Sequence, residues 1–511
     1  MIHRGNLEKL ARRGTASVAG AACSAVFGVL LVLIVTNGFP PALAGTLFAA
    51  TSVFLILESV ILLGTDTGLV KVVPAQLAGG RPRDLPRTLA VAAAPVLASS
   101  LVAAVLLHQL APSLAGALVG ADDAAAMSAM LRALAVVLPV AALHDLAVAA
   151  TRGTGTMRPT VVVENLGRLG LQALAVLGVH LAGGGPAALA LAWCLPYVVG
   201  LAAGGLWLRS LVTARTASGP PATPWRSVAR EFWAFTAPRA VARVTQTALK
   251  RSDIVLVAAL ASPTEAALYT AATRLIVVGQ LFVQAVQQAL SPHVSALFAR
   301  GDAAAAGSVF QAATTWSVLA AWPFFLTLAG FSPLLMGLFG AGYAAASDVV
   351  VILALTMLLA TACGPVDAVL LMAGRSWLSL RNSTVALAVN IGLNLVLIPL
   401  DGIRGAAIAW SVAIVVRNLL PLRQVRRDLR MWPVTPSAAR VCLLAVACFG
   451  AVDLVVLGTD LAPPADAGVL AVGVLVQAAA VWRWRGPLGL EAFRAVVRPR
   501  RPADAPAAAP A

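Results

Sequence analysis

The sequence predicts an all-α membrane protein of about fourteen transmembrane helices. Its 511 residues are 60% hydrophobic and only 11% charged, and their mean hydropathy is +0.89. A water-soluble protein of this composition would lack the polar side chains that cover a surface. Apolar stretches of at least the roughly 20 residues that cross a hydrocarbon core recur along the chain. In lipid, each such segment must satisfy its own backbone hydrogen bonds, and a helix does so.

The apolar stretches set the expected domain organisation. They lie near residues 14–36, 41–64, 88–110, 128–150, 160–182, 186–208, 232–260, 265–297, 307–331, 345–372, 376–399, 403–424, 437–458 and 466–484. We expect six spans in a first lobe (14–211) and six in a second (232–424), with a cytoplasmic linker (212–231) between them. The remaining parts are a cytoplasmic N-terminus (1–13), two added spans (437–485) and a disordered cytoplasmic tail (486–511) rich in Pro and Ala.

Basic residues alternate between loops. They fill the segment before the first span and the loops after every even-numbered span, whereas the other loops contain no Lys or Arg except Arg404. This is the positive-inside pattern, and it predicts that both termini lie in the cytoplasm of a bacterium whose inner membrane the chain crosses. A cleavable signal peptide ending at Ala42-Leu43-Ala44 is the alternative for the first span, but the apolar run is too long for one.

Composition and motifs argue against other classes of protein. The net charge of +16 would suit nucleic acid, but its distribution over alternate loops assigns it to membrane topology. The five cysteines stand in apolar stretches without metal-ligand spacing. No phosphate-binding glycine loop or His-Glu-x-x-His signature occurs in a suitable context. We therefore expect no enzymatic activity, metal, cofactor or nucleic-acid partner.

An internal repeat relates the two lobes. GTLFAA at 45–50 resembles AALYTA at 266–271, an offset of 221 residues, and the same offset superposes Gly80 on Gly301 and Gly153 on Gly374. LGLQ at 169–172 likewise matches IGLN at 391–394, and PAALA at 186–190 matches GAAIA at 405–409. Because each repeat contains an even number of spans, the lobes are expected to be parallel, with a central cavity between them as in many transporters.

The seventh span carries polar residues on one helical face. They are Arg239, Arg243, Gln246, Lys250 and Asp253, with Arg251 adjacent. A central Arg or Lys costs roughly 2.5–3.5 kcal/mol on insertion scales, so such residues usually mark a functional pathway. The alternative is a cytoplasmic amphipathic helix that precedes a shorter span.

The eighth span has a second polar stripe. It comprises Thr273, Gln280, Gln284, Gln287 and Ser291, with Arg274 beside it. Two polar stripes on successive spans predict facing walls of a hydrated cavity. Hydrogen bonds between helices would explain the glutamines nearly as well, but not the cations.

The first lobe carries intramembrane charge in three spans. Glu58 lies in the second span, Asp145 in the fourth, and Glu164 and Arg168 in the fifth. Together with Asp253, these residues are candidates for ion coupling or pairing. Glu164 and Arg168 have the i, i+4 spacing of a helical ion pair. Glu58 has no local partner, so it is either matched across helices or protonatable.

Several segments together resemble the polysaccharide-type flippases of the multidrug/oligosaccharidyl-lipid/polysaccharide exporter superfamily. They are AGTLFA (44–49), LGTDTGLVK (63–71), RSDIVL (251–256), ALYTAA (267–272), Gly364-Pro365, Ala373-Gly374-Arg375 and GAAIA (405–409). The resemblance extends over about residues 10–430. It implies two six-helix lobes, often with two added helices, around a cavity lined by the first, second, seventh and eighth spans.

The resemblance also implies a function. It is the alternating-access translocation of an undecaprenyl-diphosphate-linked oligosaccharide, with membrane lipids and a polysaccharide polymerase or glycosyltransferases as partners. Arg239, Arg243 and Lys250 would then offset the diphosphate charge, and the glutamines would suit sugar hydroxyls. The first span carries no intramembrane charge, unlike the peptidoglycan-precursor branch, which favours capsule or exopolysaccharide units.

Two other functions remain open. A cation-coupled multidrug exporter of the same superfamily would prefer an acidic or aromatic cavity, and three cations on one face argue against it. A scaffold that recruits polysaccharide enzymes would not need charge inside the membrane.

Overall fold

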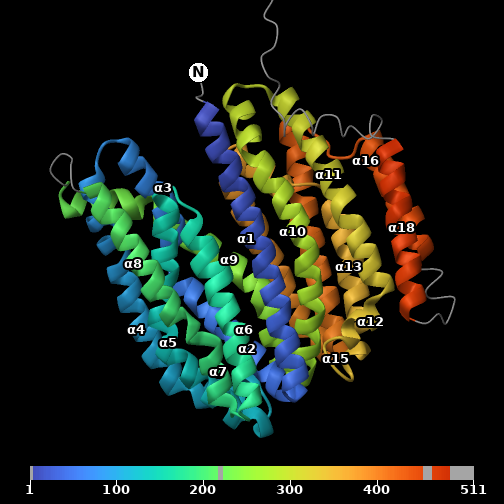
Figure 1. Cartoon of the computed structure of the whole chain (residues 1–511), viewed down its shortest axis with the longest axis horizontal. Coiled ribbons are helices and arrows are strands. Elements are labelled where there is room, and N and C mark those ends of the chain that lie inside the picture. The colour runs from blue at the N-terminus through green and yellow to red at the C-terminus, as the bar shows by residue number, and fades with distance from the viewer. Residues whose placement is uncertain (1–3, 217–222, 453–462, 484–511) are drawn as a thin grey trace, which may run out of the picture. The chain divides into compact units, whose positions relative to one another are not determined.

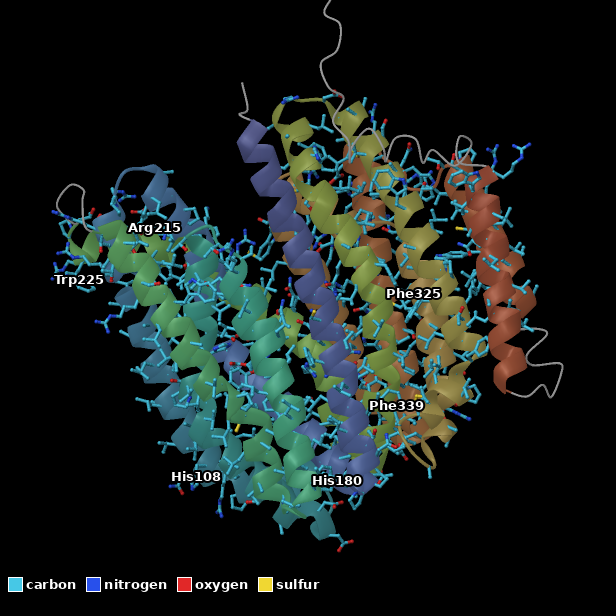
Figure 2. All side chains as sticks on the ribbon, in the orientation of Figure 1. His108, His180, Arg215, Trp225, Phe325 and Phe339 are labelled. Carbon is cyan, nitrogen blue, oxygen red and sulfur yellow. The ribbon has the colours of Figure 1, made fainter. Side chains whose placement is uncertain are left out.

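The computed structural model describes residues 4–216, 223–452 and 463–483 (Figure 1). Every regular element within these ranges is a helix, which confirms the predicted all-α fold. The ends of the molecule also separate as the basic loops predict. His108 and His180, which adjoin loops without basic residues, lie at the end of the helices opposite Arg215 and Trp225 (Figure 2).

Helices of the first half coincide with the first six predicted spans. Their bounds are α1 (Arg4–Gly38), α2 (Pro41–Ile61), α3 (Thr65–Ala78), η1 (Pro82–Asp84), α4 (Leu85–Leu118), α5 (Ala121–Gly153), η2 (Thr160–Arg168), α6 (Leu169–Leu181), α7 (Pro186–Cys194) and α8 (Pro196–Thr216). Pro41 and Pro186 each begin a helix, where a missing backbone N–H costs nothing. The segment η2 is a π-helix, a geometry that is frequent at functional sites.

The second half follows the predicted spans as closely. Its elements are α9 (Trp225–Leu260), α10 (Pro263–Ala299), α11 (Ala303–Gly330), α12 (Ser332–Gly337), η3 (Tyr343–Ala346), α13 (Ser347–Ala362), α14 (Val366–Met372), α15 (Ser376–Gln424), η4 (Val425–Leu429), α16 (Pro436–Ala445), η5 (Val446–Gly450) and α18 (Pro463–Arg483). The helix α15 contains two predicted spans and breaks at Asp401 and Gly402, where φ reaches +51° at the glycine.

Ten helical segments in the described residues are long and apolar enough to cross a membrane. Helix α9 is not among them because charged side chains recur along it, and two further apolar helices at Pro436–Gly450 and Gly468–Arg483 are shorter. The count of fourteen therefore stays a prediction. The predicted N-terminal segment is helical from Arg4, while residues 453–458 of the thirteenth span and the predicted disordered tail lie outside the described residues.

The chain forms two compact units that differ from the predicted lobes. Unit 1 comprises Met1–Leu281, Ser332–Leu353 and Leu380–Arg417, and unit 2 comprises Phe282–Phe331, Ala354–Ser379 and Asn418–Ala511. Unit 1 thus contains the whole first half, α9 and parts of other second-half helices.

Within unit 1, the two halves of the sequence meet at the end that carries no basic loops. A Cβ at Gly45 of α2 would lie 1.6 Å from the Pro263 carbonyl oxygen at the start of α10. The Asn37 amide donates a hydrogen bond of 3.0 Å to the Leu338 carbonyl. The glycine of the repeated GTLFAA segment is therefore required for the close approach of α2 to α10.

Helix α9 packs along α2, α3 and α4 of the first half. The corner between α2 and α3 makes this possible, because Gly64 has φ of +74° and a Cβ there would lie 2.8 Å from the Ala240 nitrogen. One turn later, a Cβ at Gly68 would lie 2.2 Å from Thr236 Oγ1. Glycines in the segment 63–71 thus place the polar stretch of α9 beside the acidic residues of the first half.

The start of α9 is also fastened to the corner between α3 and α4. The Asp84 carboxylate accepts hydrogen bonds of 2.6 Å from both the backbone nitrogen and the hydroxyl of Thr223. The Arg87 guanidinium lies 5.6 Å from the Trp225 ring. Arg81 donates two hydrogen bonds, of 3.0 and 3.1 Å, to the Glu231 carboxylate, and this bond raises the pKa of Arg81.

Unit 2 has its own core. Ala306 and Phe310 of α11 pack with Val366 and Leu370 of α14 and with Val425 of η4. A second cluster joins α11 to the added helices α16 and η5 through apolar side chains. Thr435 caps α16 by accepting a hydrogen bond of 3.1 Å from the Ala438 nitrogen, so the start of this helix has a side-chain partner.

Candidate functional site

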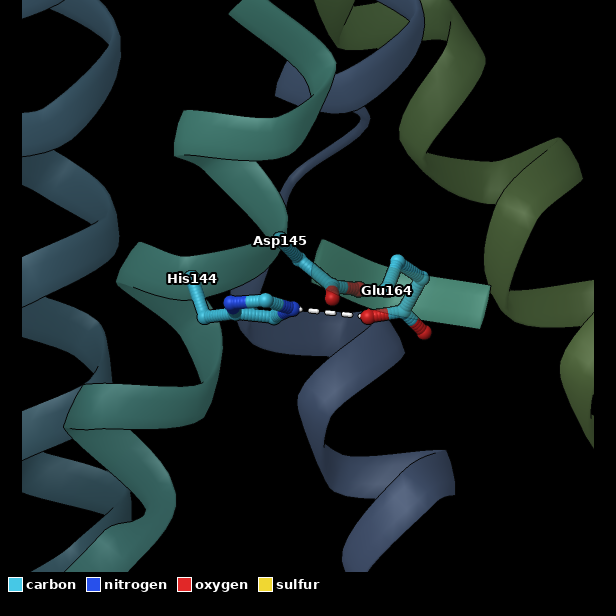
Figure 3. Close-up of side chains that lie close together, drawn as sticks. All are labelled: His144, Asp145 and Glu164. Atoms are coloured by element: carbon cyan, nitrogen blue, oxygen red, sulfur yellow. Dashed lines mark hydrogen bonds and ion pairs between the residues drawn. The ribbon is translucent and has the colours of Figure 1, made fainter. Parts of the chain in front are cut away.

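A buried ionic network lies in the first half, between α5 and η2 (Figure 3). His144 Nε2 lies 2.7 Å from Glu164 Oε2, and Arg168 Nε donates to the same oxygen at 2.9 Å. Arg168 Nη2 bonds the other oxygen, Oε1, so the i, i+4 residues form a two-pronged ion pair. The Asp145 carboxylate lies beside them. The carboxylate of Glu164 is thus already occupied by protein donors.

Aromatic packing fixes the other side of this network. The His144 ring, which is fully buried, meets the Tyr197 ring edge to face at a centroid distance of 5.5 Å. The Arg168 guanidinium lies 4.5 Å from the centroid of the Tyr197 ring. Gly200 of α8 makes room for the imidazole, since a Cβ there would come within 2.6 Å of His144 Cε1. His144 is therefore held in place by packing and orients Glu164.

Glu58 of α2 lies at the edge of the same network. Its side chain is only 4% exposed, and no described residue donates a hydrogen bond to its Oε1 atom. Its electrostatic neighbours are Asp145, Glu164, Arg168 and Arg243, of both signs. Glu58 is thus a buried carboxyl group that forms no direct ion pair in the described part of the chain.

Arg243 of α9 joins the network from the second half of the sequence. Its Nη1 lies 2.5 Å from Asp66 Oδ2, and its Nη2 lies 3.8 Å from Asp145 Oδ2. Asp66 stands in the first turn of α3, within the segment 63–71 of the family resemblance, yet the sequence pattern had not singled it out. The signal was a lone carboxylate among small residues. Its partner is 177 residues away, so sequence spacing could not reveal the pair.

Four cations form a second cluster, which contacts no carboxylate in an ion pair. Lys250 has Arg251 and Arg417 as electrostatic neighbours, and Arg251 has Arg274. The described residues contain no salt bridge to any of the four. We name this set the cation cluster; its members come from α9, α10 and α15, all within unit 1.

The cation cluster includes one residue that the sequence pattern did not single out. Arg417 is a half-buried arginine late in the twelfth span, and it lay too near the basic loop 423–430 to stand out. Its long-range contact with Lys250 has no signature in sequence spacing.

The remaining stripe residues of α9 lie in different surroundings. Arg239 stacks on Phe235 at 5.4 Å from the ring centroid, and Lys71 lies 3.6 Å from the same centroid. The side chain of Gln246 is exposed. The structure therefore groups Lys250 and Arg251 with other cations, holds Arg243 between carboxylates, and pairs Arg239 with an aromatic ring.

Asp253 is bound by neutral groups. Its Oδ1 accepts a hydrogen bond of 2.9 Å from the Asn394 amide, and its Oδ2 accepts one of 3.3 Å from the Tyr269 hydroxyl. Ser252 hydrogen-bonds Asn390 at 3.5 Å. Neither asparagine was among the sequence candidates, although Asn394 lies in the repeated IGLN segment.

The glutamines of α10 are divided between the two units. Gln280 belongs to unit 1, whereas Gln284 and Gln287 belong to unit 2. In unit 2, the Gln287 backbone carbonyl accepts a hydrogen bond of 2.6 Å from Ser291.

An apolar cavity of about 370 Å³ also lies in unit 1. It is lined by side chains of α2 and α4, among them Val53, Leu57 and Leu110, and by Val255 of α9. The lining offers no polar side chain to a sugar or phosphate, so this cavity is separate in chemistry from the cation cluster.

Known proteins match this chain in sequence and fold. The family described as "Polysaccharide biosynthesis protein" matches residues 88–348, just over half of the chain. The probable low-salt glycan biosynthesis flippase Agl15 of Haloferax volcanii is 28% identical over 169 residues, which are 33% of this chain and 36% of that protein. The match therefore spans about a third of that relative's length.

Solved structures extend the likeness in fold. The lipid II flippase MurJ, in an inward closed conformation, has a TM-score of 0.71 at 12% identity, over 90% of this chain and 97% of that one. An inward-facing multidrug resistance MATE family transporter has a TM-score of 0.66 at 14% identity, over 80% of this chain and 94% of that one. These relatives are flippases and transporters, which agrees with the prediction that the chain is not an enzyme.

The predicted class and the comparisons thus converge on one assignment. The chain belongs to the polysaccharide biosynthesis protein family, and it has the two-lobed, all-helical fold of the flippases and transporters of the multidrug/oligosaccharidyl-lipid/polysaccharide exporter superfamily.

Proposed function

We propose that this protein translocates an undecaprenyl-diphosphate-linked oligosaccharide across the bacterial cytoplasmic membrane by alternating access, for capsule or exopolysaccharide synthesis. Both termini would lie in the cytoplasm, and transport would run from the cytoplasmic to the outer leaflet. A polysaccharide polymerase or glycosyltransferases would act before or after it. The observation that carries the proposal is the cation cluster.

The depth of the cluster supports a role in transport. At 1.5 Å per helical residue, Lys250 lies about 15 Å from the end of α9 at Leu260, and Arg274 lies about 17 Å from the start of α10. Arg417 lies about 22 Å beyond the break at Gly402. In a hydrocarbon core about 30 Å thick, all three positions are inside the membrane. Unpaired cations at such depth are costly unless water or an anion reaches them.

The chemistry of the cluster suits a diphosphate. A diphosphate diester offers two anionic phosphates, and the planar guanidinium binds such oxygens with two parallel hydrogen bonds. Arg251 and Arg274, which are electrostatic neighbours, would each bind one phosphate. The exposed Gln246, together with Gln280, Gln284 and Gln287, would then contact sugar hydroxyls, and Arg239 would assist at the periphery.

The ionic network of the first half would couple transport to an ion. Counted in their ionised forms, Glu58, Asp66, Asp145 and Glu164 exceed Arg168 and Arg243 by two negative charges. Burial of excess charge favours uptake of a proton or another cation. Arg243 has Lys250 as an electrostatic neighbour, so it links this network to the cation cluster. Asp253, bound by neutral donors, is a further coupling candidate.

A cation-coupled multidrug exporter is the alternative. Its fold would be the same, but a cationic drug would be repelled by the cation cluster, which disfavours this function.

The test replaces Lys250 by Gln in protein reconstituted in liposomes with a fluorescent undecaprenyl-diphosphate disaccharide. A membrane-impermeant quencher reports the fraction of probe in each leaflet. We expect at least a tenfold slower equilibration for Lys250→Gln and wild-type rates for Lys71→Gln, a matched lysine on α3. Unchanged rates in Lys250→Gln, or no protein-dependent movement of the probe at all, would refute the proposal.

A further inference from the structure

The cation cluster holds more positive charge than a diphosphate requires. Lys250, Arg251, Arg274 and Arg417 supply four charges, whereas a diphosphate diester carries two negative charges. We infer that the oligosaccharide of the substrate is itself acidic, with a carboxylate on a sugar residue that Lys250 and Arg417 bind. The inference rests on the proposed function and specifies the substrate class.

The surplus is not neutralised by nearby carboxylates in the described residues. Asp253 follows Arg251 by two positions, yet its two oxygens accept hydrogen bonds from Asn394 and Tyr269. Asp66 and Asp145 hold Arg243. Every carboxylate near the cluster is therefore engaged elsewhere or belongs to the network of the first half, and two cations remain without an anion.

The four cations divide into two pairs by neighbourhood. Arg251 and Arg274 form one pair, and Lys250 and Arg417 form the other. Two guanidinium groups match two phosphates, which leaves the mixed pair for a single further anion. Lys250 is exposed, and Arg274 faces Gly28 of α1, where even an added Cβ would stay 4.0 Å from its Nη1 atom. Both pairs therefore have room for a ligand.

A carboxylate on the transported glycan explains why the surplus lies in the same cluster. An anionic phospholipid headgroup could supply the same charge, but then the preference would depend on the surrounding lipid and not on the sugar. The two sources are separated by measurement in nanodiscs of neutral phosphatidylcholine and in nanodiscs with added phosphatidylglycerol.

The experiment uses two undecaprenyl-diphosphate disaccharides that differ only at C6 of the outer sugar, which is CH₂OH in one and COO⁻ in the other. Their dissociation constants are measured by native mass spectrometry on the full chain in neutral nanodiscs. We expect the acidic probe to bind at least tenfold more tightly to the wild type. In Arg417→Gln this preference should fall below threefold, with binding of the neutral probe unchanged. Arg404→Gln, a matched change on α15 at an arginine paired with Asp348, should keep the preference.

Each outcome has a distinct meaning. Equal binding of both probes by the wild type would overturn the inference but leave the proposed function standing. Binding of neither probe would overturn the proposed function. A preference that survives Arg417→Gln, or one that disappears when phosphatidylglycerol is added, would overturn the assignment of the mixed pair to the glycan. Because the neutral probe reports intact folding, a misfolded variant cannot imitate the expected result.

Discussion

The contact between α3 and α9 depends on the absence of a side chain at Gly68, and Gly68→Ala tests this dependence. The added Cβ would lie 2.2 Å from Thr236 Oγ1 and 3.1 Å from Phe232 Cζ. Ordinary contact requires about 3.4 Å or more, so the two helices must separate by about 1 Å or Thr236 must rotate. Overpacking of this kind costs about 1–3 kcal/mol.

The assay compares the thermal unfolding of purified Gly68→Ala with that of two further variants. Gly205→Ala is the control, because a Cβ at Gly205 of α8 meets nothing within 4 Å. It should leave the melting temperature unchanged or raise it, since Ala is the better helix former. The double variant Gly68→Ala with Thr236→Ala removes the nearest clashing atoms and should recover most of the loss.

The double-mutant cycle decides whether the reasoning holds. If Gly68→Ala melts like Gly205→Ala, α3 and α9 do not approach each other as closely as described. If Gly68→Ala is destabilised but Thr236→Ala gives no recovery, the cost arises from some contact other than Thr236.

Two further predictions concern charge. Glu164→Gln should destabilise the protein by about 3–5 kcal/mol, because it leaves the buried Arg168 without its counter-charge, and the double variant with Arg168→Gln should recover part of the loss in a melting experiment; equal losses in both would contradict this role. Glu231→Gln, by contrast, breaks a half-exposed pair with Arg81 and should cost at most about 1 kcal/mol, with a smaller effect at high salt. A larger, salt-independent loss would show that this pair does more than join two surface groups.

Long apolar segments made the course of the chain readable from sequence. Each predicted span falls on helix wherever the structure describes it, because the requirement for some 20 apolar residues leaves a strong local signal. The seventh span shows the limit of this signal. Its charged residues left two interpretations open, and the structure has one continuous helix from Trp225 to Leu260.

The candidate site could be predicted only in part. Residue type and helical spacing identified Lys250, Arg251 and Arg274, because a charge inside an apolar stretch is conspicuous on its own. Asp66 and Arg417 were missed because their importance comes from neighbours far away in the sequence. The π-helical geometry at Thr160–Arg168 also left no trace in residue periodicity, since it depends on how α5 and α8 pack around it.

The fastening of Thr223, Trp225 and Glu231 to the corner between α3 and α4 has a mechanical consequence. By descent within the repeat, α9 is the opening helix of the second copy, but its bonds make it a strut of the first. The border between duplicated segments is therefore not the border between rigid parts. A scheme of motion drawn from the duplication alone would assign this helix to the wrong partner.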